Sequence, residues 1–301
     1  MRILVTGARG QVAAALLRAG ARQDGIDVTV LGRPDLDLER PSRAAIAREA
    51  PDVVVNAAAY TAVDQAESEE GRAHSINAER AEAIAEAAAG LDLPIIQMSS
   101  DYVFSGDKDG PYTEADEPAP LNAFGRSKLA GERLVAAANP RHVILRTSWI
   151  YGEAGRNFAV RMLEAARAGE AISVVDDQYG APTLADDIAA AILKVAANLL
   201  QARDEPRLLG VFHLTAAGRT SWHGFASAIF AASRNLGGPT AALRPIRSLD
   251  YPTAAARPRN SCLDCSRLAA AHAITLRSWE DGIAPTVAAL LDRLGLKEPK
   301  P

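Results

Sequence analysis

The 301-residue chain has only two cysteines, no long apolar run and no surplus of basic residues. Cys262 and Cys265 lack the histidines or second cysteine pair of a zinc site, which predicts two reduced thiols and no metal. The apolar runs are far shorter than the roughly 20 residues that cross a bilayer, and the amino-terminal residues lack the apolar region of a signal peptide. A net charge of -4 disfavours binding to a phosphate backbone. We therefore expect a cytoplasmic protein with a small-molecule partner, without affinity for nucleic acid or membranes.

Apolar residues follow an alternation of short strand patterns and longer helical patterns. Strands are predicted at residues 2–6, 28–31, 53–56, 94–100, 143–147 and 172–175, and helices at residues 11–22, 76–89, 123–138, 157–168 and 183–200. For the last helix, Thr183 with Asp186 three residues later predicts an N-cap. Such strand and helix units predict an α/β fold with a doubly wound parallel Rossmann sheet.

The character of the sequence changes after about Tyr151, where glycines interrupt the pattern and tryptophans and prolines follow. We expect residues 1–151 and 183–215 to form an NAD(P)-binding Rossmann domain. Residues 152–182 and 216–301 would form a smaller interwoven α/β lobe for the substrate. The two parts would therefore alternate along the chain.

A glycine-rich turn joins the first predicted strand to the first predicted helix, with the spacing Gly7-x-x-Gly10-x-x-Ala13. Glycine lets the backbone approach a diphosphate, and the helix N-terminus offers free N–H groups to it. Ala13 is small enough for the helix to pack closely on the strand. This context predicts a dinucleotide site, whose contacts would come from Gly7, Arg9, Gly10, Gln11 and Val12.

The end of the second predicted strand indicates which dinucleotide is bound. An acidic residue there would bind the ribose hydroxyls of NADH, but the strand ends at Gly32-Arg33. Arg33, with Arg9, could pair with the 2′-phosphate of NADPH, which favours NADPH and leaves NADH as an alternative; both could also be solvated loop charges. Asp37 and Leu38 follow at positions suited to the adenine.

Small residues follow the third predicted strand, at the edge where open α/β sheets bind their ligands. Ala57, Ala58 and Ala59 would let a flat cofactor lie against the backbone, and Tyr60 and Thr61 continue this segment. Tight packing alone would explain the alanines but not their position. We include these five residues in the cofactor site.

Phe124 and Lys128 are four residues apart and share one face of a predicted helix, and Ser100 ends a strand 24 residues before Phe124. This spacing resembles the Ser/Thr, Tyr and Lys triad of the extended short-chain dehydrogenase/reductase superfamily. The resemblance extends to the dTDP-4-dehydrorhamnose reductase family over nearly the whole chain. The segments that carry it are residues 56–64, 99–104, 121–132, 146–152, 177–183 and 257–261.

The resemblance implies NADPH-dependent reduction of the 4-keto group of a nucleotide-linked deoxysugar, of the type that converts dTDP-4-dehydro-L-rhamnose to dTDP-L-rhamnose. Carried over to this chain, Lys128 binds the nicotinamide ribose and Ser100 orients the carbonyl. The implied contacts to the sugar or nucleotide are Ser100, Asp101, Tyr102, Trp149 and Arg257. Arg257 with Arg259 could clamp a diphosphate, or both could be ordinary surface charges.

Phe124 departs from the family pattern, because members of the family have a tyrosine there as proton donor. A phenyl ring keeps the shape but has no O–H, so the general acid is lost while packing is kept. Slow turnover could continue with Ser100, Tyr102 or a water. Three accounts remain open: an engineered substitution, a natural non-catalytic dinucleotide-binding regulatory homologue, and a changed reaction.

Two further positions concern assembly and the core. Some family members bridge subunits with magnesium through an acidic residue early in the first helix, but the helix that begins at Gln11 has none there. We therefore expect a monomer or homodimer without a metal bridge. His213 lies in a strand-like apolar run and is predicted to be a core histidine; Trp222 and Trp279 are also predicted to be in the core.

Overall fold

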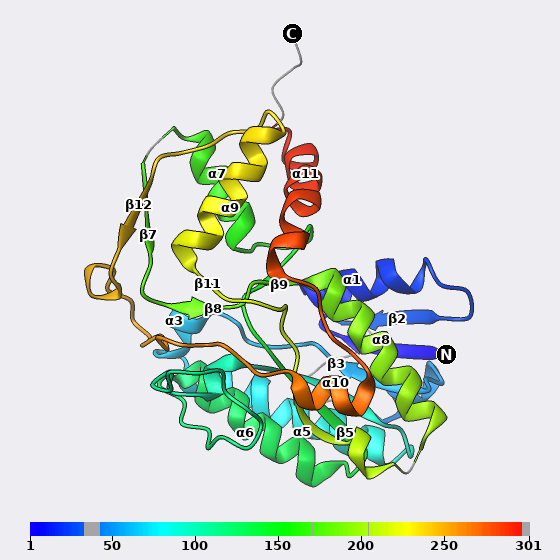
Figure 1. The fold of residues 1–301 in the computed structure, drawn as a ribbon. Coiled ribbons are helices and arrows are strands. Elements are labelled where there is room, and N and C mark those ends of the chain that lie inside the picture. Colours follow the sequence, from blue (N-terminus) through cyan, green and yellow to red (C-terminus); the bar gives the residue numbers. More distant parts are fainter. Residues whose placement is uncertain (33–42, 170, 204, 297–301) are drawn as a thin grey trace.

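A six-stranded sheet in which every neighbouring pair is parallel forms the centre of the computed structural model, which describes residues 1–32, 43–169, 171–203 and 205–296. The strand order is β10-β5-β4-β3-β1-β2. The strands are β1 (Arg2–Thr6), β2 (Asp27–Leu31), β3 (Val53–Asn56), β4 (Ile95–Ser100), β5 (His142–Thr147) and β10 (Gly210–His213). The predicted parallel α/β fold is confirmed (Figure 1).

Both faces of this sheet are covered by helices, which explains why its strands are continuous apolar runs. Side chains alternate between the faces of a strand: Ile3 and Val5 pack in one core cluster and Leu4 in another. The first cluster includes α1 (Gln11–Gly20), α8 (Ala185–Gln201) and α10 (Ser266–His272). The second includes α2 (Arg43–Arg48), α5 (Arg80–Ala89) and α6 (Ala123–Ala138), and Figure 1 shows α5 and α6 on the side opposite to α1 and α8.

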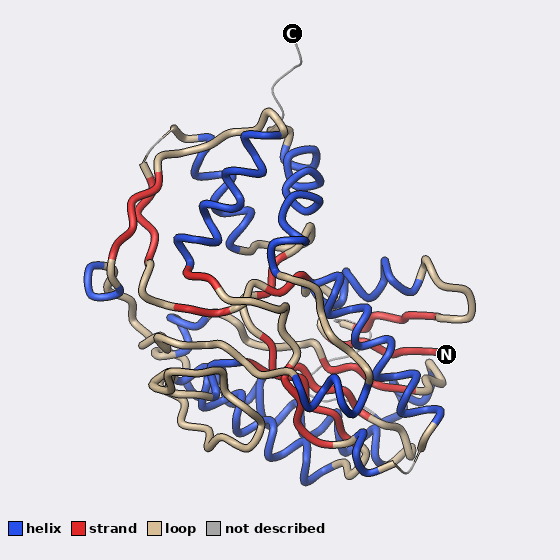
Figure 2. Tube along the Cα trace, in the orientation of Figure 1, coloured by secondary structure: helices blue, strands red, loops and turns tan. Residues whose placement is uncertain are grey.

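A separate apolar cluster lies above the sheet in Figure 1 and is built on α7 (Phe158–Arg167), α9 (Trp222–Asn235) and α11 (Ile283–Leu294). Three two-stranded sheets, drawn in red in Figure 2, connect to it. Their strands are β6 (Ile150–Tyr151), β7 (Ile172–Val175), β8 (Tyr179–Gly180), β9 (Thr183–Leu184), β11 (Thr220–Ser221) and β12 (Leu243–Ile246). The domain boundaries expected from the sequence stay a prediction.

Short elements complete the chain. They are the helices α3 (Val63–Ala66) and α4 (Glu70–His74), the π-helical turn η1 (Ser75–Glu79), and the 3-10 turns η2 (Asp101–Val103), η3 (Pro206–Leu208), η4 (Ser248–Asp250) and η5 (Trp279–Gly282). The helix predicted at residues 76–89 therefore starts earlier, at Glu70, and contains a π turn before α5. Turns of this π type often lie at functional sites.

The predicted N-cap at Thr183 is wrong. The helix begins two residues later, with Leu184 at the N-cap, and no side chain caps it. Thr183 lies in β9, and its Oγ1 donates to the carbonyl of Ala181 at 3.0 Å. The strand pairing between β6 and β9 thus outweighs the local capping preference.

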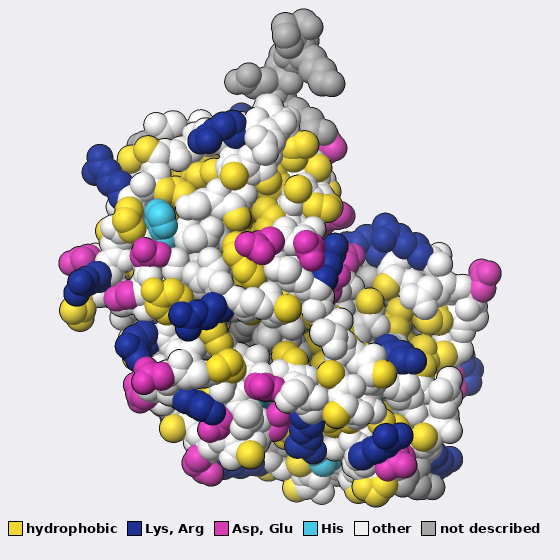
Figure 3. Space-filling model, in the orientation of Figure 1, with side chains coloured by type: hydrophobic (Ala, Val, Ile, Leu, Met, Phe, Trp, Pro, Cys, Tyr) yellow, Lys and Arg dark blue, Asp and Glu magenta, His cyan; other side chains and the backbone are white. Residues whose placement is uncertain are grey.

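The described helices include none with both the length and the apolar composition to cross a bilayer. On the face drawn in Figure 3, Lys and Arg side chains are interspersed with Asp and Glu. This mixture is typical of a solvated surface.

Candidate active site

The glycine turn between β1 and α1 packs against the loop that follows β3. Gly7 has a φ of +93°, and a Cβ on it would lie 2.8 Å from the backbone nitrogen of Ala58. The turn is closed by the Gly10 N–H, which donates to the Gly7 carbonyl at 2.8 Å. Gly10 is the N-cap of α1 and has no side chain to bind the first N–H groups of the helix. A diphosphate fits this arrangement, because neither glycine of the turn has a side chain that would keep the phosphates away from the backbone N–H groups.

The other predicted cofactor residues near this turn differ in their surroundings. Arg9 is exposed, Val12 is buried in the first core cluster, and Gln11 contacts the segment after β5. The Gln11 Nε2 donates to the Ile150 carbonyl at 3.3 Å, and its Oε1 accepts from Asn157 Nδ2 at 3.0 Å. Gln11 thus links the glycine turn to the N-cap of α7. Arg33, Asp37 and Leu38 lie outside the described residues.

The loop from Ala57 to Thr61 is held by a residue that the sequence analysis did not single out, Asn77 in η1. The Tyr60 N–H donates to Asn77 Oδ1 at 2.8 Å, and Asn77 Nδ2 donates to the Tyr60 carbonyl at 3.1 Å. The same Nδ2 donates to Ser127 Oγ in α6 at 2.9 Å. Ala57, Ala58 and Ala59 are half-buried. Asn77 therefore fixes this loop relative to the helix that carries Phe124 and Lys128.

Ser100 and Asp101 form a buried pair where β4 ends. Ser100 caps η2 by accepting from the Tyr102 N–H at 3.1 Å, and its Oγ donates to Asp101 Oδ1 at 2.7 Å. Burial raises the pKa of the Asp101 carboxyl to about 6, against the lowering effect of the Ser261 and Ser100 hydroxyls. Asp101 Oδ2 has no hydrogen-bond partner among the described residues. The site thus contains a buried carboxyl group that is hydrogen-bonded to Ser100 and lies beside the Ser261 hydroxyl.

Lys128 is buried against the adjoining strand, and its Nζ donates to the Met98 carbonyl at 2.7 Å. Burial lowers the pKa of this ammonium to about 8, and the negative charge of Glu132 opposes the change. Behind it, Glu132 forms a buried ion pair with Arg146 at 2.6 Å and accepts from Ser99 Oγ at 2.5 Å. No local sequence pattern indicates this ion pair, because its two partners lie on different elements, α6 and β5.

Phe124 is buried at the start of α6, whose N-cap Asn122 accepts from the Gly125 N–H at 2.8 Å. A Cβ on Gly125 would lie 2.1 Å from the Tyr102 carbonyl oxygen, so the absence of a side chain lets α6 approach η2 closely. The rings of Phe124 and Tyr102 meet edge to face with centroids 5.8 Å apart. The structure thus places Tyr102 against Phe124, and Lys128 against β4 two residues before Ser100. The roles expected for Ser100, Phe124 and Lys128 stay predictions.

Trp149 lies just after β5 in a backbone conformation that is rare for its type, with a φ of +47°. Its indole stacks on Trp222 of α9 at 3.6 Å between centroids, and a Cβ on Gly180 would lie 2.6 Å from its Cε2. Trp222 is only partly buried, whereas Trp279 is in the core as predicted. The partner of Trp149 was therefore missed in the sequence, where 73 residues separate the two indoles.

Arg257 is engaged in an ion pair that the sequence did not indicate. Its two terminal nitrogens each donate to one carboxylate oxygen of Asp64 at 2.7 Å, and the Ala255 N–H donates to Asp64 at 3.1 Å. Arg257 lowers the pKa of Asp64. Arg259 instead pairs with the exposed Asp109 at 3.2 Å. Asp64 thus joins helix α3 to the segment that contains Ala255 and Arg257.

His213 is fully buried, with its Nδ1 3.1 Å from the Tyr112 carbonyl and 3.2 Å from that of Asp264. Burial, and then the positive charge of Arg146, lowers its pKa to about 3. The prediction of a core histidine is confirmed. Both cysteines are free thiols, and burial raises their pKa values. The described part of the chain holds no cluster of three or more His, Cys, Asp or Glu suited to a metal.

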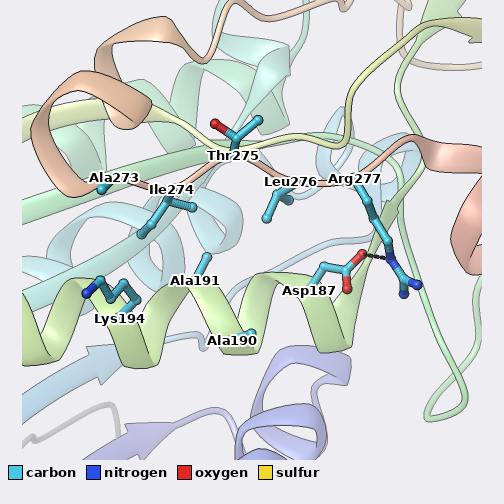
Figure 4. A pocket seen from close by; sticks show the side chains of 9 residues that line it. All are labelled: Asp187, Ala190, Ala191, Lys194, Ala273, Ile274, Thr275, Leu276 and Arg277. Carbon is cyan, nitrogen blue, oxygen red and sulfur yellow. Dashed lines mark hydrogen bonds and ion pairs between the residues drawn. The ribbon is translucent and has the colours of Figure 1, made fainter.

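A shallow pocket lies between α8 and residues 273–277, where Arg277 Nε donates to Asp187 Oδ2 at 2.9 Å (Figure 4). Its lining residues are Asp187, Ala190, Ala191, Lys194, Ala273, Ile274, Thr275, Leu276 and Arg277. None of them belongs to the residues predicted to bind the cofactor or the sugar. We therefore place the candidate active site at the carboxyl ends of β1, β3 and β4, and not in this pocket.

The parallel sheet, the glycine turn and the Ser100 and Lys128 side chains define a member of the extended short-chain dehydrogenase/reductase superfamily. Residues 1–291 match the family model described as the RmlD substrate binding domain, and the chain belongs to the dTDP-4-dehydrorhamnose reductase family. It is 46% identical over 293 residues to the dTDP-4-dehydrorhamnose reductase of Sinorhizobium fredii, covering 97% of this chain and 98% of that protein.

Two solved structures agree with this assignment. The structure of a dTDP-4-dehydrorhamnose reductase from Clostridium acetobutylicum has a TM-score of 0.87 and 34% identity, covering 98% of this chain and all of that one. A dTDP-4-dehydrorhamnose reductase from Bacillus anthracis in complex with NADP has a TM-score of 0.86 and 32% identity, covering 95% of this chain and 98% of that one. The family resemblance seen in the sequence is confirmed.

Proposed function

We propose that this protein reduces the 4-keto group of a dTDP-linked 6-deoxysugar with NADPH, in the manner of dTDP-4-dehydro-L-rhamnose to dTDP-L-rhamnose. The observation that carries the proposal is the placement of Ser100 and the buried Lys128 around one strand end, beside the glycine turn. Membership of the reductase family supports it. The NADP complex of the Bacillus anthracis relative supports the choice of cofactor.

The residues present fit a dinucleotide. The diphosphate would lie against Gly7, Gly10 and the first N–H groups of α1, with Arg9, Gln11 and Val12 beside it. The loop of Ala57, Ala58, Ala59, Tyr60 and Thr61 would support the nicotinamide half, and Lys128 would bind its ribose. Arg33, Asp37 and Leu38 keep the adenosine roles expected from the sequence. Stronger binding of NADH than of NADPH would count against the role of Arg33 and Arg9.

When bound, NADPH supplies the hydride that is transferred to C4 of the sugar. The protein must position the carbonyl and supply one proton to its oxygen. Ser100 orients that oxygen through its hydroxyl, while Asp101, Tyr102, Trp149 and Arg257 contact the sugar or the nucleotide. Lys128 holds the ribose and adds positive charge near the developing oxyanion. Phe124 shapes the site but donates no proton.

The alternative is a non-catalytic regulatory homologue that binds the dinucleotide. The buried Asp101 and Lys128 side chains favour the reductase, because ionisable groups with strongly shifted pKa values cluster at functional sites. We propose a turnover slower than in relatives that have a tyrosine at this position. The first turn of α1 has no acidic residue, and we propose a monomer or homodimer without a metal bridge.

The test is to compare Phe124→Tyr with the parent protein by following NADPH oxidation with dTDP-4-dehydro-L-rhamnose. Adding a general acid is worth about 10²–10⁴-fold in rate, so we expect kcat to rise by that order while the Kd of NADPH stays the same. Phe230→Tyr is the matched control, because it adds a hydroxyl to a buried ring in the cluster built on α7, α9 and α11, away from the candidate site. Absence of activity in both the parent and Phe124→Tyr, with NADPH still bound, would contradict the reductase function.

A further inference from the structure

The carboxyl group of Asp101 is the one acidic side chain in direct contact with the hydroxyl predicted to touch the substrate carbonyl, as far as the described residues show. Its Oδ1 lies 2.7 Å from Ser100 Oγ, and the residue is 3% exposed. Its Oδ2 has no hydrogen-bond partner among those residues. A buried carboxylate is usually stabilised on both oxygens. Asp101 is thus placed as a group whose protonated form suits its surroundings.

The charges around Asp101 do not favour its ionised form strongly. Burial, and then the negative charge of Asp101, raises the pKa of Tyr102 in the same turn and of Cys262 in the segment beside it, so both stay neutral at pH 7. The polar neighbours that lower its pKa are Ser261 and Ser100, which do so less than burial raises it. The balance leaves a carboxyl that gains or loses its proton near pH 6.

Asp101 lies next to the place where the tyrosine proton donor of the family is missing. Ser100 Oγ contacts Asp101 and the Tyr102 N–H, and the Tyr102 ring contacts Phe124, which has no hydroxyl to donate a proton. We propose that Asp101 supplies, through the Ser100 hydroxyl, the proton that carbonyl reduction requires in this chain. The inference rests on the proposed function and names the acid that its mechanism lacks.

Bound NADPH would supply a hydride: a C–H bond of its dihydronicotinamide ring would break, a C–H bond would form at C4 of the sugar, and the electron pair of the C=O π bond would move to the oxygen. For this step the Asp101 proton lies on Oδ1, so that Oδ1 donates to Ser100 Oγ across the 2.7 Å contact. The sugar oxygen takes the proton of Ser100 Oγ, and Ser100 Oγ takes the proton of Asp101 Oδ1. The products are NADP⁺, the C4 alcohol, an unchanged Ser100 and an Asp101 carboxylate. Solvent returns one proton to Asp101 after the product leaves.

Two other groups at the site are rival donors. Tyr102 contacts the Phe124 ring, but burial and the charge of Asp101 raise the pKa of its phenol, which makes it a weaker acid. The Lys128 ammonium, with a pKa of about 8, is already hydrogen-bonded to the Met98 carbonyl at 2.7 Å. Each rival predicts a different pH dependence from that of an acid which titrates near pH 6.

The experiment is a double-mutant cycle of Asp101→Asn and Phe124→Tyr, measured as kcat for NADPH oxidation with dTDP-4-dehydro-L-rhamnose between pH 5 and 9. With Phe124 in place, Asp101→Asn should lower kcat by about 10²-fold or more, the usual contribution of a general acid. In the F124Y background the same change should have a far smaller effect, because the phenol supplies the proton. The parent kcat should fall above pH 6, and that fall should be absent from F124Y.

Folding and charge are controlled separately. Asp109→Asn removes an exposed carboxylate and should leave both kcat and its pH profile unchanged. Titration with NADPH, followed by nucleotide fluorescence, reports whether Asp101→Asn keeps its cofactor site. An unchanged Kd with a lowered kcat supports the relay.

Five results would overturn the inference. Equal losses on Asp101→Asn in both backgrounds would make Asp101 a structural or sugar-binding residue. A parent rate that falls near pH 8 would assign the proton to Lys128. An active F124Y beside an inactive parent, or a parent insensitive to Asp101→Asn, would remove the relay but keep the reductase. Inactivity of both F124Y and the parent with NADPH bound would remove the proposed function, and the relay with it.

Discussion

Replacing Asp101 by asparagine should make the protein more stable at neutral pH, although it removes a hydrogen-bonded side chain from the site. In the folded chain burial raises the pKa of this carboxyl from 3.8 to about 6. Above pH 6 the folded protein therefore keeps an ionised group in surroundings that favour its neutral form. Asparagine has a similar shape, can still accept from Ser100 Oγ and carries no charge.

The size of the effect follows from the two pKa values. Each tenfold difference in a protonation equilibrium corresponds to about 1.4 kcal/mol, so the ionised carboxylate of Asp101 costs about 3 kcal/mol at pH 7 relative to the unfolded chain. Between pH 4 and 6 the folded state binds more protons than the unfolded state, and stability falls as the pH rises through this window. Below pH 4 both states are protonated and the cost disappears.

The assay is urea unfolding of the parent and of Asp101→Asn, followed by tryptophan fluorescence at several pH values from 4 to 8. We expect the free energy of unfolding of the variant to exceed that of the parent by up to about 3 kcal/mol at pH 7, with a difference that shrinks toward pH 4. Asp109→Asn, at an exposed position, should show no such trend. A variant that is less stable than the parent by the same amount at every pH would refute the reasoning.

Two further predictions concern residues around the site. Glu132→Gln leaves the buried guanidinium of Arg146 without its counter-charge, so the free energy of unfolding in urea should fall by about 3–5 kcal/mol. Glu70→Gln, at an exposed ion pair, should lower it by less than about 1 kcal/mol. Equal losses in the two variants would contradict the importance of burial. Trp222→Leu removes the ring stacked on Trp149, a contact worth about 0.5–1.5 kcal/mol. The KM for the nucleotide sugar should rise about threefold to tenfold, and the Kd of NADPH should stay unchanged. A change in the Kd of NADPH larger than that in the KM would contradict a role of this ring pair in sugar binding.

The fold was predictable because its signals are local. Helix α6 was placed at residues 123–138 from its apolar period, and the structure has the same bounds, with Asn122 as the N-cap. The central strands β1, β3, β4 and β5 were predictable because each is a short, largely buried apolar run. The predicted N-cap at Thr183 was wrong because the Thr183 hydroxyl donates to the Ala181 carbonyl and its backbone belongs to strand β9, which pairs with β6. A local capping rule takes account of neither contact.

The candidate site was predictable only in part. Ser100, Phe124 and Lys128 were identified because a strand end and one helix turn fix their spacing. Asn77 was missed, since its partners Tyr60 and Ser127 lie 17 and 50 residues away. The same holds for the pairing of Asp64 with Arg257, 193 residues apart. Such contacts depend on the packing of whole elements, and no local pattern reports them.

The most direct test of the proposed reduction is hydride transfer itself. The parent protein and Phe124→Tyr would each be incubated with dTDP-4-dehydro-L-rhamnose and NADPH that carries deuterium at the transferred position of C4. We predict deuterium at C4 of the sugar in the dTDP-linked product of both proteins, measured by mass spectrometry and NMR, with faster incorporation by Phe124→Tyr. A sugar that gains no deuterium in either protein, while NADPH is shown to bind, would contradict the reductase function.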